Sequence, residues 1–330
     1  MTWFLGIDGG GTHTRALIAH ASGAVLGMGV AGSSNYPSVG LARAVAALGE
    51  AIAAARGEAR VAGEAEGAFL GLAGVKTAAD HLAWREPLAG LNLVKPKSPA
   101  ALGLDHDLRI ALAGGCGDSP GIVVVAGTGS AGYGRDLSGH SAQVGGWGWL
   151  LDDQGGGVWL AGQGLRRVME AADGRASATR LEPALFAELG VTTAREAMQW
   201  AMRPDTSPSQ LAALASVVVD ASVDDDAARG IVWEGARQLA RLVDAILSQL
   251  DFGAGDVAIV PAGGLLGNPA YREPVRDEIA KIAPCAQLMN SSAPALVGAV
   301  VLAAQTAGTP LTREAVARLA AEVRSRRQIV

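Results

Sequence analysis

Near its beginning the chain carries a glycine-rich turn between two short apolar runs, in FLGIDGGGTHTRALIAH (residues 4–20). Residues 14–20 are apolar and β-branched without a helical period, so the runs on both sides of the turn predict strands. A dinucleotide-binding GxGxxG turn leads from a strand into a helix, and a Walker A turn ends in Gly-Lys-Ser/Thr. The stretch fits neither pattern. Glycines between two strands instead predict that a ligand approaches the backbone closely at this turn.

The same unit returns in GIVVVAGTGSAGYGR (residues 121–135), where a buried strand, a Gly-Thr-Gly-Ser turn and a second short strand follow one another. We interpret the two units as an internal duplication. A third apolar strand, in DVAIVPAGGLLGN (residues 256–268), also ends in a Gly-Gly turn. Three glycine-rich strand ends in one chain indicate a shared function for these turns.

Helical periods and strand patterns alternate along the rest of the chain. A strand is predicted within residues 66–75, and helices are predicted at residues 40–56 with Gly57 as the C-cap, at 108–115, over most of 176–252, at 293–307 and at 312–328. No long linker of low complexity separates the two halves. The 330 residues therefore predict an α/β protein of two domains that meet in a cleft.

Composition narrows the class of function. Hydrophobic residues make up 49% and charged residues 18% of the chain, and the formal net charge is −5, which disfavours nucleic acid as a partner and favours a small molecule. The longest apolar helix, at residues 293–307, is too short to span a membrane. Cys116 and Cys285 are isolated in the sequence, so we expect free thiols in a reducing cytosol rather than a disulfide or a metal site. The start of the chain does not resemble a signal peptide, and we expect a cytoplasmic protein.

The glycine-rich turns are suited to bind phosphate. Backbone N–H groups in such turns form anion-binding concavities, and hydroxyl groups can donate further hydrogen bonds. The hydroxyls available here are Thr12, Thr14, Thr128 and Ser130. Two similar turns on two similar halves predict a phosphate chain held between the domains. Asp8 lies beside the first turn, and since a carboxylate repels phosphate unless a cation intervenes, we expect Mg²⁺ there, bound through water.

Four motifs resemble those of one protein family. GIDGGGTHT, AGTGS, GGWGWLLDDQGGG and PAGGLLGN are similar to motifs of the BadF/BadG/BcrA/BcrD ATPase family, which includes the eukaryotic-type N-acetylglucosamine kinases and belongs to the actin/sugar kinase/Hsp70 fold superfamily. The resemblance runs from residue 3 to about residue 305. It implies two duplicated ribonuclease H-like (actin-like ATPase) domains with a nucleotide cleft between them. The expected domains are residues 1–117, joined by the C-terminal helix at about 306–330, and residues 118–305. A homodimer is also implied.

The resemblance further implies roles for individual residues. Those expected to contact ATP are Gly9, Gly10, Gly11, Thr12, Thr128, Gly129, Gly263 and Gly264. Those expected to contact an amino sugar are Asn35, Asp107, Ser130, Gly146, Trp147, Gly148 and Asp153. Asp107 would be the general base that accepts the proton of the sugar hydroxyl. The family pattern has Asn where this chain has His106, and Glu where it has Gln154, which leaves the exact sugar open.

Without the family resemblance, the residues alone leave more than one role open for several of these positions. Asp107 could cap the following helix, with Asp105 as an equal candidate for either role, and it is the family spacing to ALAGG that favours Asp107 as the base. Asn35 lies in a loop where a turn former is common. Trp147 could stack on a sugar or be buried, and Trp149 is expected in the core.

Three functions are compatible with a fold of this kind. The resemblance favours an ATP- and Mg²⁺-dependent amino-sugar kinase, acting on the 6-hydroxyl of N-acetylglucosamine, with glucosamine and N-acetylmuramic acid as alternatives. An ATPase that activates a reductase or dehydratase would need a cysteine-held cluster, for which Cys116 has no second cysteine nearby. A sugar-sensing regulator is disfavoured because no DNA-binding domain precedes the first strand.

Overall fold

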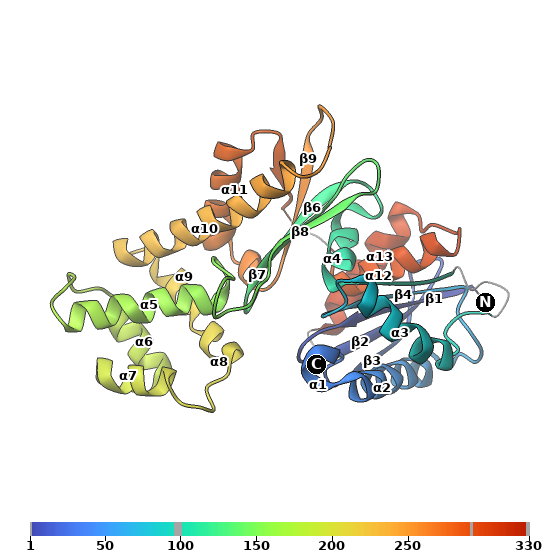
Figure 1. Cartoon of the computed structure of the whole chain (residues 1–330), viewed down its shortest axis with the longest axis horizontal. Coiled ribbons are helices and arrows are strands. Elements are labelled where there is room, and N and C mark those ends of the chain that lie inside the picture. Colours follow the sequence, from blue (N-terminus) through green and yellow to red (C-terminus); the bar gives the residue numbers. More distant parts are fainter. Residues whose placement is uncertain (1, 96–100, 291–292, 328–330) are drawn as a thin grey trace. The chain divides into compact units, whose positions relative to one another are not determined.

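The computed structural model describes residues 2–95, 101–290 and 293–327 (Figure 1). Its packing divides the chain into two compact units, Met1–Ser119 with Ser292–Val330, and Pro120–Ser291. We call them the first unit and the second unit. Among the described residues, none of the helices combines the length and apolarity that crossing a bilayer requires.

The first unit contains a five-stranded sheet in the order β3-β2-β1-β4-β5. Its elements are β1 (Trp3–Gly9), β2 (Thr14–His20), β3 (Val25–Ala31), α1 (Tyr36–Val39), α2 (Leu41–Ala59), β4 (Gly67–Leu72), α3 (Ala78–Gly90), β5 (Leu102–Asp105), α4 (Asp107–Cys116), α12 (Ala295–Thr306) and α13 (Arg313–Arg327). Strands β1, β2 and β3 pair antiparallel, whereas β1, β4 and β5 are parallel.

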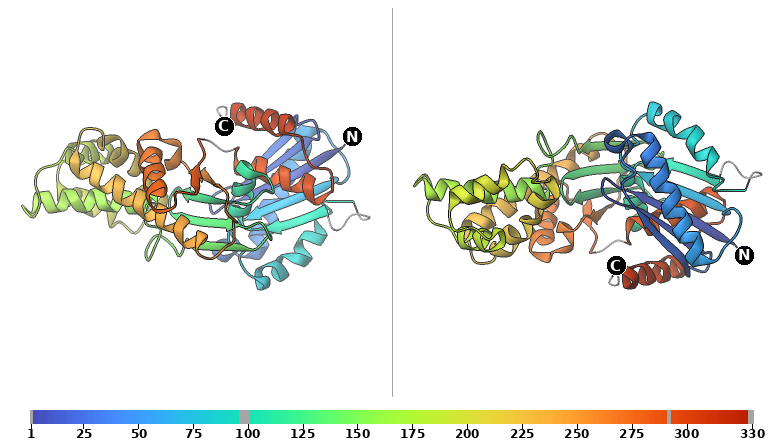
Figure 2. Two further views of the ribbon diagram at one scale, coloured as in Figure 1. Left: turned by 90° about the horizontal axis from the view of Figure 1, so that it is seen from above. Right: turned by 90° about the horizontal axis from the view of Figure 1, so that it is seen from below.

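Side chains alternate between the two faces of this sheet, as the period of a strand requires. From β1, Leu5 and Ile7 pack with α2 and α3, whereas Phe4 packs with α12 and α13 on the opposite face. Figure 2 shows α2 lying across one side of these strands. Gly6 is needed where α12 crosses β1, since a Cβ there would lie 2.7 Å from the backbone nitrogen of Val300.

The second unit repeats this topology, with a sheet in the order β10-β9-β6-β7-β8. Its elements are β6 (Gly121–Ala126), β7 (Ser130–Arg135), β8 (Ser141–Gly145), α5 (Gly157–Ala172), α6 (Leu181–Leu189), α7 (Ala194–Ala201), α8 (Pro208–Ala213), α9 (Ala215–Ala221), α10 (Asp226–Leu247), β9 (Val257–Ala262), the 3₁₀ turn η2 (Leu265–Gly267), α11 (Pro269–Ile282) and β10 (Ala286–Leu288). Again a three-stranded antiparallel meander is extended by two parallel strands. This repetition is the duplication that the two glycine-rich units indicated.

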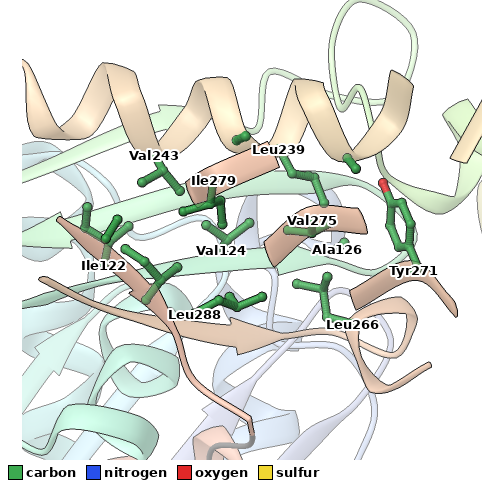
Figure 3. Close-up of a cluster of buried hydrophobic side chains, with 14 of the residues drawn as sticks. Ile122, Val124, Ala126, Leu239, Val243, Leu266, Tyr271, Val275, Ile279 and Leu288 are labelled. Atoms are coloured by element: carbon green, nitrogen blue, oxygen red, sulfur yellow. The ribbon is translucent and has the colours of Figure 1, made fainter. Parts of the chain in front are cut away.

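The core of the second unit lies between its sheet and two helices. In Figure 3, Leu239 and Val243 of α10 point toward Ile122 and Val124 of β6. The buried Tyr271 of α11 donates a 2.7 Å hydrogen bond from its hydroxyl to the carbonyl of Gly155. Because Gly155 belongs to the loop that leads into α5, this bond links the core to the loop with the GGWGWLLDD motif.

Some elements differ from those expected. The helix begun at residue 41 continues past Gly57 to Ala59, and Arg60 ends it in the left-handed conformation with φ 50°. Helix α12 packs on β1, β4 and α4, so the chain returns to the first unit at residue 292 rather than at about 306. Strands β5, β8 and β10 and helices α3 and α11 were not predicted; strands of three to five residues carry too little pattern to be recognised.

Candidate functional site

In the first unit, the residues predicted to be functional gather at one edge of the sheet. Strands β1, β3, β4 and β5 run in the same direction, so their carboxyl ends meet at this edge. Asp8 is the last but one residue of β1, Asn35 follows β3, and Asp107 follows β5. In open α/β sheets this edge is where ligands bind. We call this group the first-unit site.

The glycines of the β1–β2 turn serve different purposes. A Cβ on Gly9 would lie 2.3 Å from Ser34 Oγ and 2.5 Å from Leu72 Cδ2, so Gly9 permits close packing beneath the turn. Gly10 donates its N–H to the carbonyl of His13 at 2.9 Å, which closes the turn. Gly11 and Thr12 are exposed. Of the four predicted ATP contacts in this turn, Gly11 and Thr12 are therefore open to a ligand, whereas Gly9 has a structural role.

Asn35 is held beside this turn by its own loop. Ser33 donates its hydroxyl to the Gly10 carbonyl at 3.2 Å and accepts the Asn35 N–H at 3.2 Å. The Asn35 side chain donates to Ser38 Oγ at 3.0 Å and lies against Gly74, whose φ is +89° and whose Cβ would be 2.8 Å from Asn35 Oδ1. Asn35 thus directly precedes the short helix α1, and its side chain lies next to the β1–β2 turn.

Asp107 does not cap α4. The N-cap is His106, whose Nδ1 accepts the Arg109 N–H at 3.2 Å, and Asp107 is the first helical residue. The alternative in which Asp107 or Asp105 supplies the cap is therefore wrong. His106 can take the capping position because an imidazole nitrogen accepts a hydrogen bond from a backbone N–H, as a carboxylate oxygen does.

Burial and nearby charges act in opposite directions on Asp107. Burial raises the pKa of its carboxyl above the ordinary value, while the charges of His106 and Lys76 and the hydrogen bond from the Leu108 N–H oppose this rise. Burial also lowers the pKa of His106. A carboxylate with a raised pKa is a better proton acceptor than an ordinary one. The environment of Asp107 is thus suited to a general base.

Lys76 was not recognised from the sequence. It follows β4 at the same edge of the sheet and is close enough to act electrostatically on both Asp107 and His106. Its backbone N–H donates to Asp80 Oδ2 at 2.9 Å, and Asp80 also accepts a short hydrogen bond from the hydroxyl of Tyr36. Asp80 thereby links the Lys76 turn to the helix that follows Asn35. Burial opposes ionisation of Asp80, but these hydrogen bonds outweigh it and lower its pKa to about 2.

In the second unit, the β6–β7 turn is joined to the beginning of α5. The N–H groups of Gly157 and Val158 donate to the carbonyls of Gly127 and Thr128 at 2.8 and 3.0 Å. The helix N-terminus therefore fixes the turn, and the Thr128 side chain is exposed above it. Ser130 is buried and donates its hydroxyl to the Gln154 carbonyl at 2.8 Å, so its proton is already used within the protein.

Asp153 lies directly against this turn. A Cβ on Gly129 would lie 2.1 Å from Asp153 Oδ2, and one on Gly156 would lie 2.5 Å from the Gly129 carbonyl carbon. Asp153 itself has φ 57°, which few non-glycine residues adopt. The structure thus brings the predicted sugar-contacting carboxylate into contact with a glycine predicted to contact ATP. We call the Gly127–Ser130 turn and Asp153 the second-unit site.

The third glycine-rich turn reaches the same edge. Strands β6 and β9 are parallel, and Gly263 follows β9 with φ +85°. Its Cβ would lie 2.2 Å from the Ala126 carbonyl oxygen, so only glycine fits this approach. Gly264 has open space at its Cβ position and precedes η2. Of the ATP contacts predicted in this turn, Gly263 and Gly264 are both exposed, and Gly263 also allows the two turns to meet.

The Trp-containing loop is largely exposed. Trp147 is 81% exposed and Trp149 is 50% exposed, and Leu150 and Leu151 are exposed as well. The expectation that Trp149 is in the core is wrong, because the loop that carries it leaves Trp149 and its neighbours Leu150 and Leu151 exposed. The flanking Gly146 and Gly148 have φ +72° and +104°. Asp152 stabilises the loop by accepting the Trp147 N–H at 3.3 Å.

One predicted metal ligand, Asp8, is suitably placed to bind a metal ion. Among the described residues no group of three or more His, Cys, Asp or Glu side chains is arranged to hold a metal ion. Mg²⁺ in nucleotide sites is commonly held by one or two carboxylates, several waters and the phosphates themselves. The partly buried Asp8, at the end of β1 and beside the Gly10 turn, fits that mode of binding.

Comparisons with known proteins identify the family of the chain. The model of the BadF/BadG/BcrA/BcrD ATPase family matches residues 5–303. The chain is 28% identical over 309 residues to an N-acetylmuramic acid/N-acetylglucosamine kinase of Clostridium acetobutylicum, covering 92% of this chain and 98% of the relative. It is also 28% identical to an N-acetyl-D-glucosamine kinase of Dictyostelium discoideum, covering 91% of this chain and 97% of the relative.

Solved structures of two other proteins are similar to this chain in fold. A candidate N-acetylglucosamine kinase from Chromobacterium violaceum is 26% identical, with a TM-score of 0.70, covering 92% of this chain and 99% of that chain. A glucokinase of the ROK family from Streptomyces griseus, solved with glucose and AMPPNP, is 17% identical with a TM-score of 0.57, covering 92% of this chain and 99% of that chain, and shows similarity of fold.

Proposed function

The chain belongs to the BadF/BadG/BcrA/BcrD ATPase family, and we propose that within this family it is an ATP-dependent amino-sugar kinase that phosphorylates the 6-hydroxyl of N-acetylglucosamine. Both curated relatives described above are kinases of N-acetylated amino sugars. The observation that carries the proposal is the environment of Asp107, a partly buried carboxylate of raised pKa at the carboxyl edge of the first sheet.

In this reaction Asp107 accepts the proton of the sugar hydroxyl as the γ-phosphoryl group of ATP is transferred to its oxygen. Phosphoryl transfer needs positioning and neutralisation of charge more than covalent help from the protein. The exposed Gly11 and Thr12 of the first unit, and Thr128 of the second, offer N–H and hydroxyl groups to phosphate oxygens. That these turns border one cleft, with ATP between the domains, stays a prediction.

Mg²⁺, when bound, would neutralise the phosphates, and Asp8 would hold it through water. The sugar would be bound by Asn35 from the first unit and by Asp153 and Trp147 from the second. Asn35 and Asp153 are each placed against a glycine of the adjoining turn. This placement supports a sugar that lies next to the phosphates.

Two further properties are part of the proposal. We infer a homodimer, which size-exclusion chromatography with light scattering would test against a monomer of 33.3 kDa. We also infer a cytoplasmic location, since ATP and Mg²⁺ are supplied there and both cysteines are free thiols.

The test is an ADP-release assay with Mg-ATP and a panel of N-acetylglucosamine, glucosamine, N-acetylmuramic acid, N-acetylmannosamine and glucose. We expect release with an amino sugar, lost in Asp107→Asn and retained in the matched control Asp105→Asn. The control removes a carboxylate two residues away that bonds the His106 N–H at 2.8 Å. ADP release that is independent of every sugar would instead identify an ATPase that serves another protein.

A further inference from the structure

The loop that carries Asp153 adopts an uncommon backbone conformation. We call residues 152–156 the Asp153 loop. Asp153 has φ 57° and Gly155 has φ +83°. A Cβ on Gly155 would lie 2.6 Å from the carbonyl oxygen of Gly235 in α10. Because a non-glycine residue stays in the left-handed region only where the surrounding structure holds it, the contacts of this loop decide where the Asp153 carboxylate lies.

Two successive carbonyls of the Asp153 loop accept hydrogen bonds from hydroxyl groups elsewhere in the second unit. The Gln154 carbonyl accepts the hydroxyl of Ser130, which belongs to β7, at 2.8 Å. The Gly155 carbonyl accepts the hydroxyl of Tyr271, which belongs to α11, at 2.7 Å. These two hydroxyls attach the loop to the sheet on one side and to the helical part of the core on the other.

Tyr271 is a core residue whose hydroxyl reaches the loop. Its side chain is fully buried, and in Figure 3 the hydroxyl points from α11 toward α10. A Cβ on Gly235 of α10 would lie 2.7 Å from this oxygen, so the glycine leaves the room that the hydroxyl needs to reach Gly155. Burial raises the pKa of the Tyr271 phenol, which therefore stays protonated and able to donate.

This hydrogen bond connects the core to the second-unit site. Gly155 is itself buried, and a buried carbonyl that loses its donor is costly. Asp153 lies two residues before Gly155, with its carboxylate against Gly129 of the β6–β7 turn. A movement of the Gly155 peptide would therefore displace the carboxylate from the turn.

We propose that Tyr271 is a positioning residue of the second-unit site: its hydroxyl holds the Gly155 carbonyl and thereby fixes the place of the Asp153 carboxylate. The inference rests on the proposed kinase function, in which Asp153 binds the sugar. It adds a residue of the core that acts on sugar binding through the loop and contacts no substrate. Its effect is therefore specific to the sugar and requires the Asp153 side chain.

The test begins with Tyr271→Phe, which removes the hydroxyl and keeps the ring in the core. A buried carbonyl that loses its donor shifts the balance between the held and the released loop by about tenfold or more. We expect the KM for N-acetylglucosamine to rise by up to about tenfold, with a much smaller change in the KM for ATP. Sugar affinity is also measured as Kd by calorimetry, which does not require turnover.

Val275→Ala is the matched control. Val275 lies one turn further along α11, is fully buried in the same core and is labelled in Figure 3. Its truncation should lower the melting temperature at least as much as Tyr271→Phe does, because it leaves a cavity, yet it should leave the KM for the sugar unchanged. The control thus separates a loss of stability from a loss of position.

A double-mutant cycle shows whether the effect passes through Asp153. In an Asp153→Ala background there is no carboxylate to position, so Tyr271→Phe should leave the Kd for the sugar unchanged while still lowering the melting temperature. Three results would overturn the inference and leave the kinase intact: wild-type sugar affinity in Tyr271→Phe, a full loss in the Asp153→Ala background as well, or an equal loss in Val275→Ala. A wild type that phosphorylates no sugar of the panel would overturn both proposals.

Discussion

Replacement of Gly129 by alanine should displace Asp153 and impair sugar phosphorylation. The added Cβ would lie 2.1 Å from Asp153 Oδ2, whereas ordinary van der Waals contact begins at 3.4 Å, so the carboxylate must move by about 1.3 Å. A misplacement of about 1 Å in a catalytic site costs roughly 10²-fold in rate. We therefore expect kcat/KM for N-acetylglucosamine to fall by about two orders of magnitude.

A double-mutant cycle identifies the cause of that loss. In Asp153→Ala the colliding carboxylate is absent, so adding Gly129→Ala should cost much less than it does in the wild type. Gly162→Ala is the matched control, because this glycine of α5 has nothing within 4 Å of its Cβ position. Wild-type kinetics in Gly129→Ala, or a full additional loss in the Asp153→Ala background, would refute the reasoning.

Three other changes test the remaining parts of the site. Asp107→Asn should abolish phosphorylation yet stabilise the fold near neutral pH. A carboxyl whose pKa is raised by folding binds more protons in the native state, so its contribution to stability is lost as pH rises through that pKa. Thermal melts of the variant and the wild type at pH 4 and pH 8 test this, and a variant that gained no stability at pH 8 would contradict it. Gly10→Val should abolish ADP release while the circular dichroism spectrum stays unchanged, and normal turnover would exclude the turn as the phosphate site. Trp147→Ala should raise the KM for the sugar without lowering the melting temperature, because the side chain is 81% exposed and adds little to the core; an unchanged KM would remove Trp147 from the site.

Sequence pattern predicted the parts of the site that depend on local structure. The turns at Gly10, Gly129 and Gly263 were located because glycine after an apolar strand is recognisable in a short window. Gly9 and Gly263 prove to be spacers against Ser34 and Ala126, whereas Gly264 has open space at its Cβ position and a Cβ on Gly11 would only touch Asn35 Nδ2 at 3.9 Å. That distinction depends on what lies opposite each glycine, which the local pattern does not contain.

The environment of Asp107 shows the same limit. Its place before a short helix could be read from the sequence, but the helix cap fell to His106, and Lys76 comes close only because β4 lies beside β1 and β5 in the sheet. Strand order is decided by contacts between residues far apart in the chain. The burial that raises the pKa of Asp107 has the same origin.

The sequence by itself determined that two strand–turn–strand units repeat and to which family the chain is similar, and it predicted that their turns bind phosphate, because these features depend on residue spacing within short stretches. Only the tertiary structure decided that α12 packs on β1 and that Asp153 lies on Gly129. Each of these contacts joins segments separated by tens to hundreds of residues. Such contacts are selected by the burial and fit of whole surfaces, and the period of a single helix or strand does not specify its partner.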